Sequence, residues 1–136
     1  MLDSNVLVAA LRSHRGASFR LLQLLRDKRF EVAVSVPLVL EYEAVLLRHG
    51  TELGITPAEA IGVVNYLCRV AHRQDVHFIW RPALSDPGDE FILELAVAAG
   101  CAAIVTHNVR DFKGAKPFGV KVLTPGEFLL SIKEDA

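Results

Sequence analysis

Short apolar runs typical of strands alternate along the chain with longer amphipathic segments typical of helices. The strand-like runs occupy residues 30–34, 76–79, 103–106 and 121–123, and the helix-like segments residues 6–11, 17–25, 35–49, 56–71, 86–99 and the stretch from 124 onward. Strands joined through helices pair in parallel, and the helices then cover both faces of the sheet. The alternation predicts an α/β fold, a three-layer α/β/α sandwich with a central parallel sheet.

Several helix-like segments carry cap residues at their ends. Ser35 precedes a segment with Pro37 in its first turn, and Thr56 is followed three residues later by Glu59, the pattern of a capping box. Gly100 comes directly after the segment 86–99, where a helix would end. These signals predict where helices start and stop from local hydrogen bonding alone.

The length of 136 residues predicts one domain, residues 1–136. With 51% hydrophobic residues and a net charge of −1, the chain is expected to fold and to present an apolar face to a partner. Two cysteines make no disulfide framework, and no apolar run reaches the roughly 20 residues of a membrane span. We therefore expect a soluble, cytoplasmic protein that does not enter membranes.

Four carboxylates fall where a parallel sheet binds its ligands, beyond the carboxyl ends of the strands. Asp3 follows the first strand, to which only Met1 and Leu2 can belong, and Glu41 lies in the second turn of the helix after the second strand, residues 30–34. Asp89 lies in the first turn of the helix before the strand 103–106, and Asp111 lies in the turn after that strand. We expect the four side chains to converge on one crevice.

Three of these acids, Asp89, Asp111 and Glu41, also have a purely structural interpretation. Asp89, with its neighbour Asp86, is placed to complement a helix dipole. Asp111 suits a turn, and Glu41 suits a solvated helix position. The prediction of a site therefore depends on the convergence of the four acids and on no single one of them.

Clustered carboxylates raise one another's pKa values unless a cation neutralises them. Oxygen ligands favour hard ions, so Mg²⁺ or Mn²⁺ is the expected cofactor. Such an ion polarises a phosphoryl oxygen and activates a bound water, which is the chemistry of phosphodiester hydrolysis. The sequence contains no HExxH motif, no Walker loop and no GxGxxG motif, so zinc and nucleotide sites are not predicted.

Basic residues dominate the first 30 positions. They are Arg12, Arg15, Arg20, Arg26, Lys28 and Arg29, against the acids Asp3 and Asp27. A basic face beside an acidic metal site suits a phosphate backbone, and Arg12 and Arg15 lie nearest to Asp3 in the sequence. A solvated helix face or a surface that docks a partner protein is the alternative interpretation.

In four segments taken together, the chain resembles the PIN-domain ribonucleases. The segments are Asp3-Ser4-Asn5-Val6-Leu7-Val8, Leu40-Glu41-Tyr42, Asp86-Pro87-Gly88-Asp89-Glu90 and Thr106-His107-Asn108-Val109-Arg110-Asp111-Phe112. The resemblance implies an α/β/α sandwich that cleaves RNA with Mg²⁺ or Mn²⁺. It also implies that Asp3, Glu41, Asp89 and Asp111 bind the metal, and that Asn5, Thr106 and Asn108 line or orient the pocket.

Within that family the chain is most similar to toxins of prokaryotic type II toxin–antitoxin systems. The similarity implies a homodimer and a cognate antitoxin whose tail occupies the active site. Two features depart from the family pattern: Ser4 stands where Thr is usual, and only Met1 and Leu2 precede Asp3.

Two other functions remain open at this point. One is a structure-specific or DNA-directed nuclease of the same fold. The other is a non-catalytic Mg²⁺-binding module similar to a receiver domain, which would need an aspartate after its third strand and a lysine downstream. The strand-like run 76–79 ends without such an aspartate.

Overall fold

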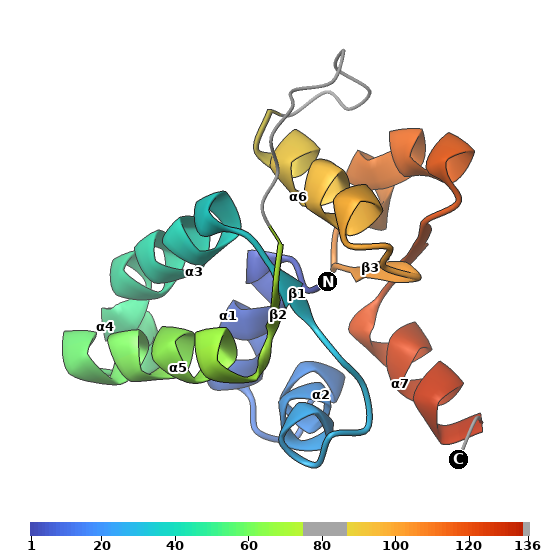
Figure 1. Cartoon of the computed structure of the whole chain (residues 1–136). Coiled ribbons are helices and arrows are strands. Elements are labelled where there is room, and N and C mark those ends of the chain that lie inside the picture. The colour runs from blue at the N-terminus through green and yellow to red at the C-terminus, as the bar shows by residue number, and fades with distance from the viewer. Residues whose placement is uncertain (75–86, 135–136) are drawn as a thin grey trace.

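The protein is described by a computed structural model, which covers residues 1–74 and 87–134 and gives only the backbone at 87–91 and 133–134. Helices and short strands alternate in it (Figure 1). In chain order they are α1 (Ser4–Arg12), α2 (Ala17–Arg26), β1 (Ala33–Val34), α3 (Val36–Arg48), α4 (Gly50–Leu53), α5 (Pro57–Val70), β2 (His72–Arg73), α6 (Pro87–Ala98), β3 (Ala103–Val105), the 3₁₀ helix η1 (Val109–Phe118), β4 (Lys121–Leu123) and α7 (Pro125–Glu134).

Every strand pairing in the described residues is parallel, as predicted. β1 pairs with β2, β3 pairs with β4, and Leu2 makes a single parallel bridge to Val105. The strand predicted at residues 30–34 is reduced to two residues, and β2 comes earlier than the strand predicted at 76–79, which falls outside the described residues. The described ladders are therefore two short pairs, with the Leu2 bridge on the edge of one.

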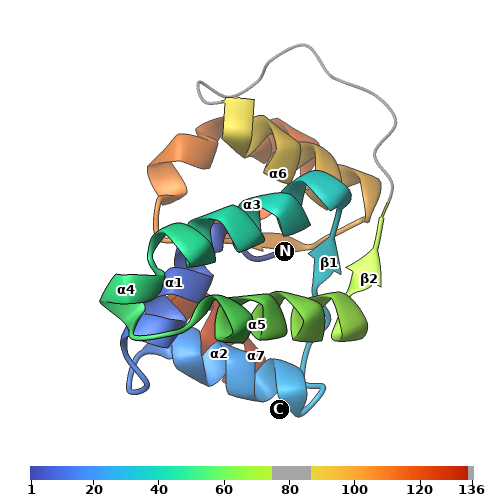
Figure 2. The same ribbon diagram turned by 90° about the vertical axis from the view of Figure 1, so that its left-hand side faces the viewer.

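Helices lie on both sides of the strands, which makes the fold an α/β sandwich. α6 packs on β1 and β3, whereas α7 packs on β4 and α2. Figure 2 shows β1 and β2 between α6 above and α5 below. The helices also pack against one another: α1 contacts α2 and α3, and α3 contacts α5. In the described part of the chain, no helix combines the length and the apolar character that crossing a bilayer requires.

The cap residues act as the sequence predicts. Ser35 Oγ accepts the backbone N–H of Leu38 at 3.4 Å, and Thr56 and Glu59 exchange the two hydrogen bonds of a capping box. Thr124 and Glu127 make the same exchange before α7. The hydrogen bond from the Thr124 backbone lowers the pKa of Glu127 below its usual value.

Two helices were not predicted: α4, and η1, which replaces the turn expected around Asp111.

The first two residues are buried in the core. The backbone of Val105 donates to the Met1 carbonyl at 2.8 Å, and the N–H of Asp3 donates to the Val105 carbonyl at 2.9 Å. The Leu2 carbonyl accepts the hydroxyl of Tyr42, a side chain that is 1% exposed. Helix α3 and strand β3 therefore both hold the backbone that leads into Asp3.

Tyr42→Phe should destabilise the protein by about 1–3 kcal/mol, because it leaves the buried Leu2 carbonyl without its donor. Urea unfolding measures the change. Tyr66→Phe is the matched control: Tyr66 is half-buried on α5, and losing its hydroxyl should cost about 0.5 kcal/mol or less. Equal losses from the two variants would show that the Tyr42 hydroxyl does not fix this backbone.

Candidate functional site

Asp3 stands immediately before α1, at the position where an aspartate normally caps its own helix. Its side chain makes no such cap. Instead the carboxylate atom Oδ2 accepts the Thr106 hydroxyl at 2.7 Å and the Asn5 amide at 3.2 Å. Asp3 is therefore directed across the molecule toward the end of β3.

Thr106 links this carboxylate to the loop after β3. It is fully buried, and its Oγ1 accepts the backbone N–H of Asn108 at 3.0 Å and the amide of Asn5 at 3.2 Å. Asn5 in turn accepts the backbone N–H of His107 at 3.2 Å through Oδ1. The structure thus brings Asn5 and Thr106 together at Asp3 and adds the backbone of Asn108 to the network.

Burial raises the pKa of Asp3, which is 6% exposed, and the charge of Asp111 adds to the rise. Hydrogen bonds from Thr106 and Ser4 act in the opposite direction but do not cancel it. The folded pKa lies above the unfolded one, so the free energy of unfolding should fall as pH rises through the interval between them. An ionised Asp3 therefore destabilises the protein unless a cation compensates it.

Glu41 approaches the same region from α3. It is half-buried, and its charge, like that of Asp3, raises the pKa of Tyr42, although burial is the main cause. Asp111 is exposed in the first turn of η1. Asp89 lies in the first turn of α6, as predicted, but its side chain is outside the described part of the structure.

Within the described residues, no three His, Cys, Asp or Glu side chains lie close enough together to hold a metal ion. The convergence of all four acids thus stays a prediction. The local chemistry nevertheless suits a hard cation, because the buried Asp3 carboxylate lies within electrostatic range of Asp111. Mg²⁺ commonly binds through one or two carboxylates and completes its shell with water and substrate phosphate.

A cleft of about 590 Å³ opens between α1 and α3, and one of its lining residues, Asn5, donates a hydrogen bond to Asp3. Its lining residues are Ser4, Asn5, Val8, Ala9, Arg12, Glu41, Val45, Arg48, His49 and His107. The lining follows helical spacing: Ser4, Val8 and Arg12 are four residues apart on α1, and Arg48 is seven residues after Glu41 on α3. The end of the cleft near Asn5 therefore carries polar side chains and one acid, Glu41, and the other end is basic.

Only one of the two arginines predicted to contact substrate lines the cleft. Arg12 lines it, whereas Arg15 is exposed in the turn between α1 and α2 and is not part of its lining. Three basic lining residues were not predicted: Arg48, His49 and His107. The seven-residue spacing from Glu41 could have identified Arg48, but nothing local in the sequence indicates the two histidines.

Thr106→Val should raise the pKa of Asp3 further, because it removes the hydroxyl that donates to the carboxylate and keeps the side-chain shape. Carbon-detected NMR titration of the Asp3 carboxyl group, without metal, measures the change. Thr106→Ser retains the hydroxyl and should leave the pKa close to that of the unaltered protein. The same pKa in the valine variant would contradict the role given to Thr106.

Comparison with known proteins gives one family. The family model described as "PIN domain" matches residues 1–110. The matched region contains Asp3, Asn5, Glu41 and Thr106, and it ends one residue before Asp111. No curated protein matches the chain.

Proposed function

The chain belongs to the PIN-domain family, whose members are generally metal-dependent nucleases, and from this premise we propose that it is an endoribonuclease that uses Mg²⁺ or Mn²⁺. The observation that carries the proposal is the Asp3 carboxylate, which is buried and accepts a hydrogen bond from Asn5, a residue that lines an open cleft together with Glu41. Burial raises the pKa of Asp3, so its ionised form is disfavoured in the folded protein, and a cation bound there would stabilise that form.

Asp3 would hold the ion together with Glu41, Asp89 and Asp111. When bound, such an ion polarises the phosphoryl oxygen and lowers the pKa of a coordinated water. The contribution of the chain itself is orientation. Thr106 and Asn5 fix one oxygen of Asp3 through two hydrogen bonds, so the carboxylate does not have to reorganise when substrate arrives.

Asn5 and Asn108 shape the loop against which a substrate would lie. Asn5 bonds Asp3 through its amide and the His107 backbone through its carbonyl oxygen, and the backbone of Asn108 is tied to Thr106. Arg12 lies along the same wall of the cleft and supplies a positive charge for the phosphate backbone. Contacts of this type position a strand without reading its bases.

The similarity of the four motifs to toxins of type II toxin–antitoxin systems supports a toxin role. In that role the chain would act in the cytoplasm, and a cognate antitoxin would occupy the cleft with its tail. A short reading frame directly upstream that encodes a DNA-binding protein would support this assignment. The presence of an unrelated gene there would weaken it.

Cleavage of single-stranded RNA should stop in EDTA and return when Mg²⁺ or Mn²⁺ is added. Asp3→Asn should lower the rate by more than about 100-fold, since changes even to outer-shell partners of a metal site cost 10–100-fold. Gel analysis of a labelled RNA and of the same sequence as DNA measures the rate and the substrate class.

The control for Asp3→Asn is Asp27→Asn, at the exposed end of α2, which should cleave RNA at the normal rate. RNA cleavage that persists in EDTA would overturn the metal mechanism. Cleavage of the DNA alone would move the protein to the DNA-directed class.

The expected homodimer has a surface that suits it. Exposed apolar side chains four and seven residues apart form an apolar band on one face of α3: Val36, Leu40 and Leu47. Helix α5, which packs against α3, exposes Ile61 and Val70. Leu40 and Val36 are 59% and 68% exposed, and both border an apolar cleft that also contains Cys68. We propose that a second copy of the chain covers this band, because burying it removes apolar surface from water.

Sedimentation at tens of micromolar should show a dimer, and Leu40→Glu should convert it to a monomer by placing a charge in the interface. Leu130→Glu is the matched control, since Leu130 is 60% exposed on α7, away from the band. It should leave the dimer intact. A monomeric unaltered protein would contradict the proposal.

A further inference from the structure

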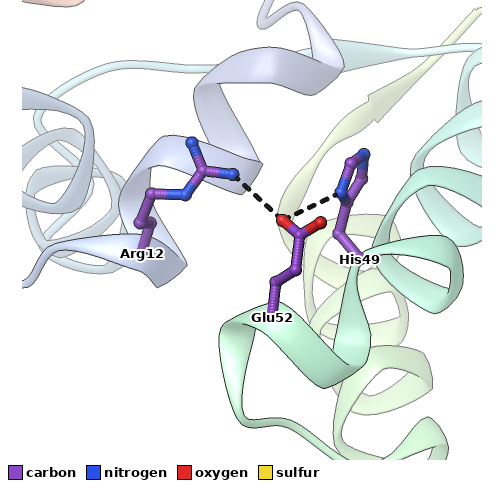
Figure 3. Close-up of polar contacts among 3 residues, drawn as sticks. All are labelled: Arg12, His49 and Glu52. Atoms are coloured by element: carbon purple, nitrogen blue, oxygen red, sulfur yellow. Dashed lines mark ion pairs between the residues drawn. The ribbon is translucent and has the colours of Figure 1, made fainter.

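Basic side chains gather at the end of the cleft farthest from Asp3. Arg12 contributes from α1, and Arg48 and His49 contribute from the end of α3. Glu52, on the short helix α4, reaches into this group (Figure 3). Its Oε2 lies 3.5 Å from Nη2 of Arg12 and 3.4 Å from Nδ1 of His49. One carboxylate oxygen therefore contacts both walls of the cleft.

The basic end lies at a defined separation from the acidic end. Arg12 follows Ser4 by eight residues on α1, which corresponds to about 12 Å along the helix axis. Arg48 follows Glu41 by seven residues on α3, about 10 Å along that axis. A nucleic-acid strand with one phosphate near Asp3 could thus place another phosphate between Arg12 and Arg48.

Glu52 is a weak partner for these groups. The Arg12 and Glu52 side chains are 60% and 63% exposed, and an ion pair between such side chains contributes about 1 kcal/mol or less. Nδ1 of His49 is buried, and despite its 3.4 Å distance from Glu52 it makes no hydrogen bond to any residue that the structure describes. The cluster therefore contains more positive charge and donor capacity than Glu52 satisfies.

A phosphate group matches this environment better than one carboxylate does. Its oxygens can accept from a guanidinium in a bidentate manner and still bond a neighbouring donor. Two arginines against one glutamate leave the cluster with a net positive charge even when His49 is neutral. An anion that replaces Glu52 would be held by Arg12, Arg48 and His49 together.

Resting on the proposed nuclease function, we propose that Arg12, Arg48 and His49 form a second phosphate subsite, and that Glu52 is its internal competitor. The phosphate of a bound strand displaces the Glu52 carboxylate from Arg12 and His49. Glu52 thus weakens the binding of nucleic acid, and removing its charge strengthens it. Glu52 would have the opposite effect if it only braced α4 against α1.

The test is binding of a labelled single-stranded RNA of mixed sequence to the full chain, measured by fluorescence anisotropy in EDTA so that no cleavage occurs. Glu52→Gln should tighten binding by about 3–10-fold, because it removes one like charge from the path of the phosphate. Arg48→Gln and Arg12→Gln should each weaken binding and reduce the slope of log K against log salt by about 0.7.

Matched controls separate the subsite from a general basic surface. Glu31→Gln and Arg69→Gln change exposed charges outside the cleft and should leave both affinity and salt slope unaltered. In the Arg12→Gln background, Glu52→Gln should gain less than it does alone, since the two side chains act on each other. Arg15→Gln should have a smaller effect than Arg12→Gln. An equal effect of the two would overturn the subsite in favour of a diffuse basic face.

Unchanged or weaker binding by Glu52→Gln would overturn the role of Glu52 as a competitor. A normal salt slope for Arg48→Gln, or no saturable binding by the unaltered chain, would overturn the subsite. The cleavage assay with Mg²⁺ reports separately on the nuclease function. The two proposals can fail separately. If Arg48→Gln loses binding to RNA and DNA while the unaltered chain cleaves neither, the subsite is supported and the nuclease function is refuted.

Discussion

The hydrogen bond from Thr106 to Asp3 joins residues 103 positions apart, and the candidate site depends on it. It places the carboxylate at the end of β3 and prevents it from capping α1. The bond can form only because the backbone on either side is already fixed. Val105 is hydrogen-bonded to Met1 and to Asp3, and the hydroxyl of Tyr42 is bonded to Leu2. One helix, one strand and the first residues of the chain therefore meet at a single side chain.

This arrangement has an energetic cost in the absence of a cation. Burial and the charge of Asp111 both raise the pKa of Asp3, so its ionised form is disfavoured in the folded state. The hydrogen bonds from Thr106 and Ser4 offset only part of that cost. A buried acid that the fold holds in place and leaves incompletely compensated is typical of functional sites, where a ligand supplies the missing interaction.

The cleft runs along two helices, α1 and α3, and its charge changes from one end to the other. Because α1 and α3 both line it, each helical repeat from Ser4 or Glu41 brings a further side chain to its wall. The side chains along the cleft change from Asn5 and Glu41 at one end to Arg12 and Arg48 at the other. α4 then adds Glu52 opposite those positive groups. A strand with evenly spaced negative charges is the class of ligand that such a graded cleft accommodates.

The sequence by itself determined the features that depend on local hydrogen bonds and local periodicity. Ser35, Thr56 and Thr124 begin helices where predicted, Gly100 follows α6 with a positive φ of 67°, and the described strands pair in parallel. The positions of Glu41 in the second turn of α3 and of Asp89 in the first turn of α6 follow from those helix starts.

Only the tertiary structure decided which side chains share a cleft. The strand expected before Asp3 is a single bridge at Leu2, and the strand expected at residues 30–34 is the two-residue β1. Both are shorter than expected because the length of a ladder depends on partners far away in the sequence. His49 and His107 reached the cleft through the packing of α3 and the loop after β3, which no local pattern encodes. Arg12 lines the cleft and Arg15 does not, because α1 ends at Arg12 and residues beyond its end no longer follow the helical spacing that faces the cleft. The pKa of Asp3 likewise depends on burial, a property of the assembled core.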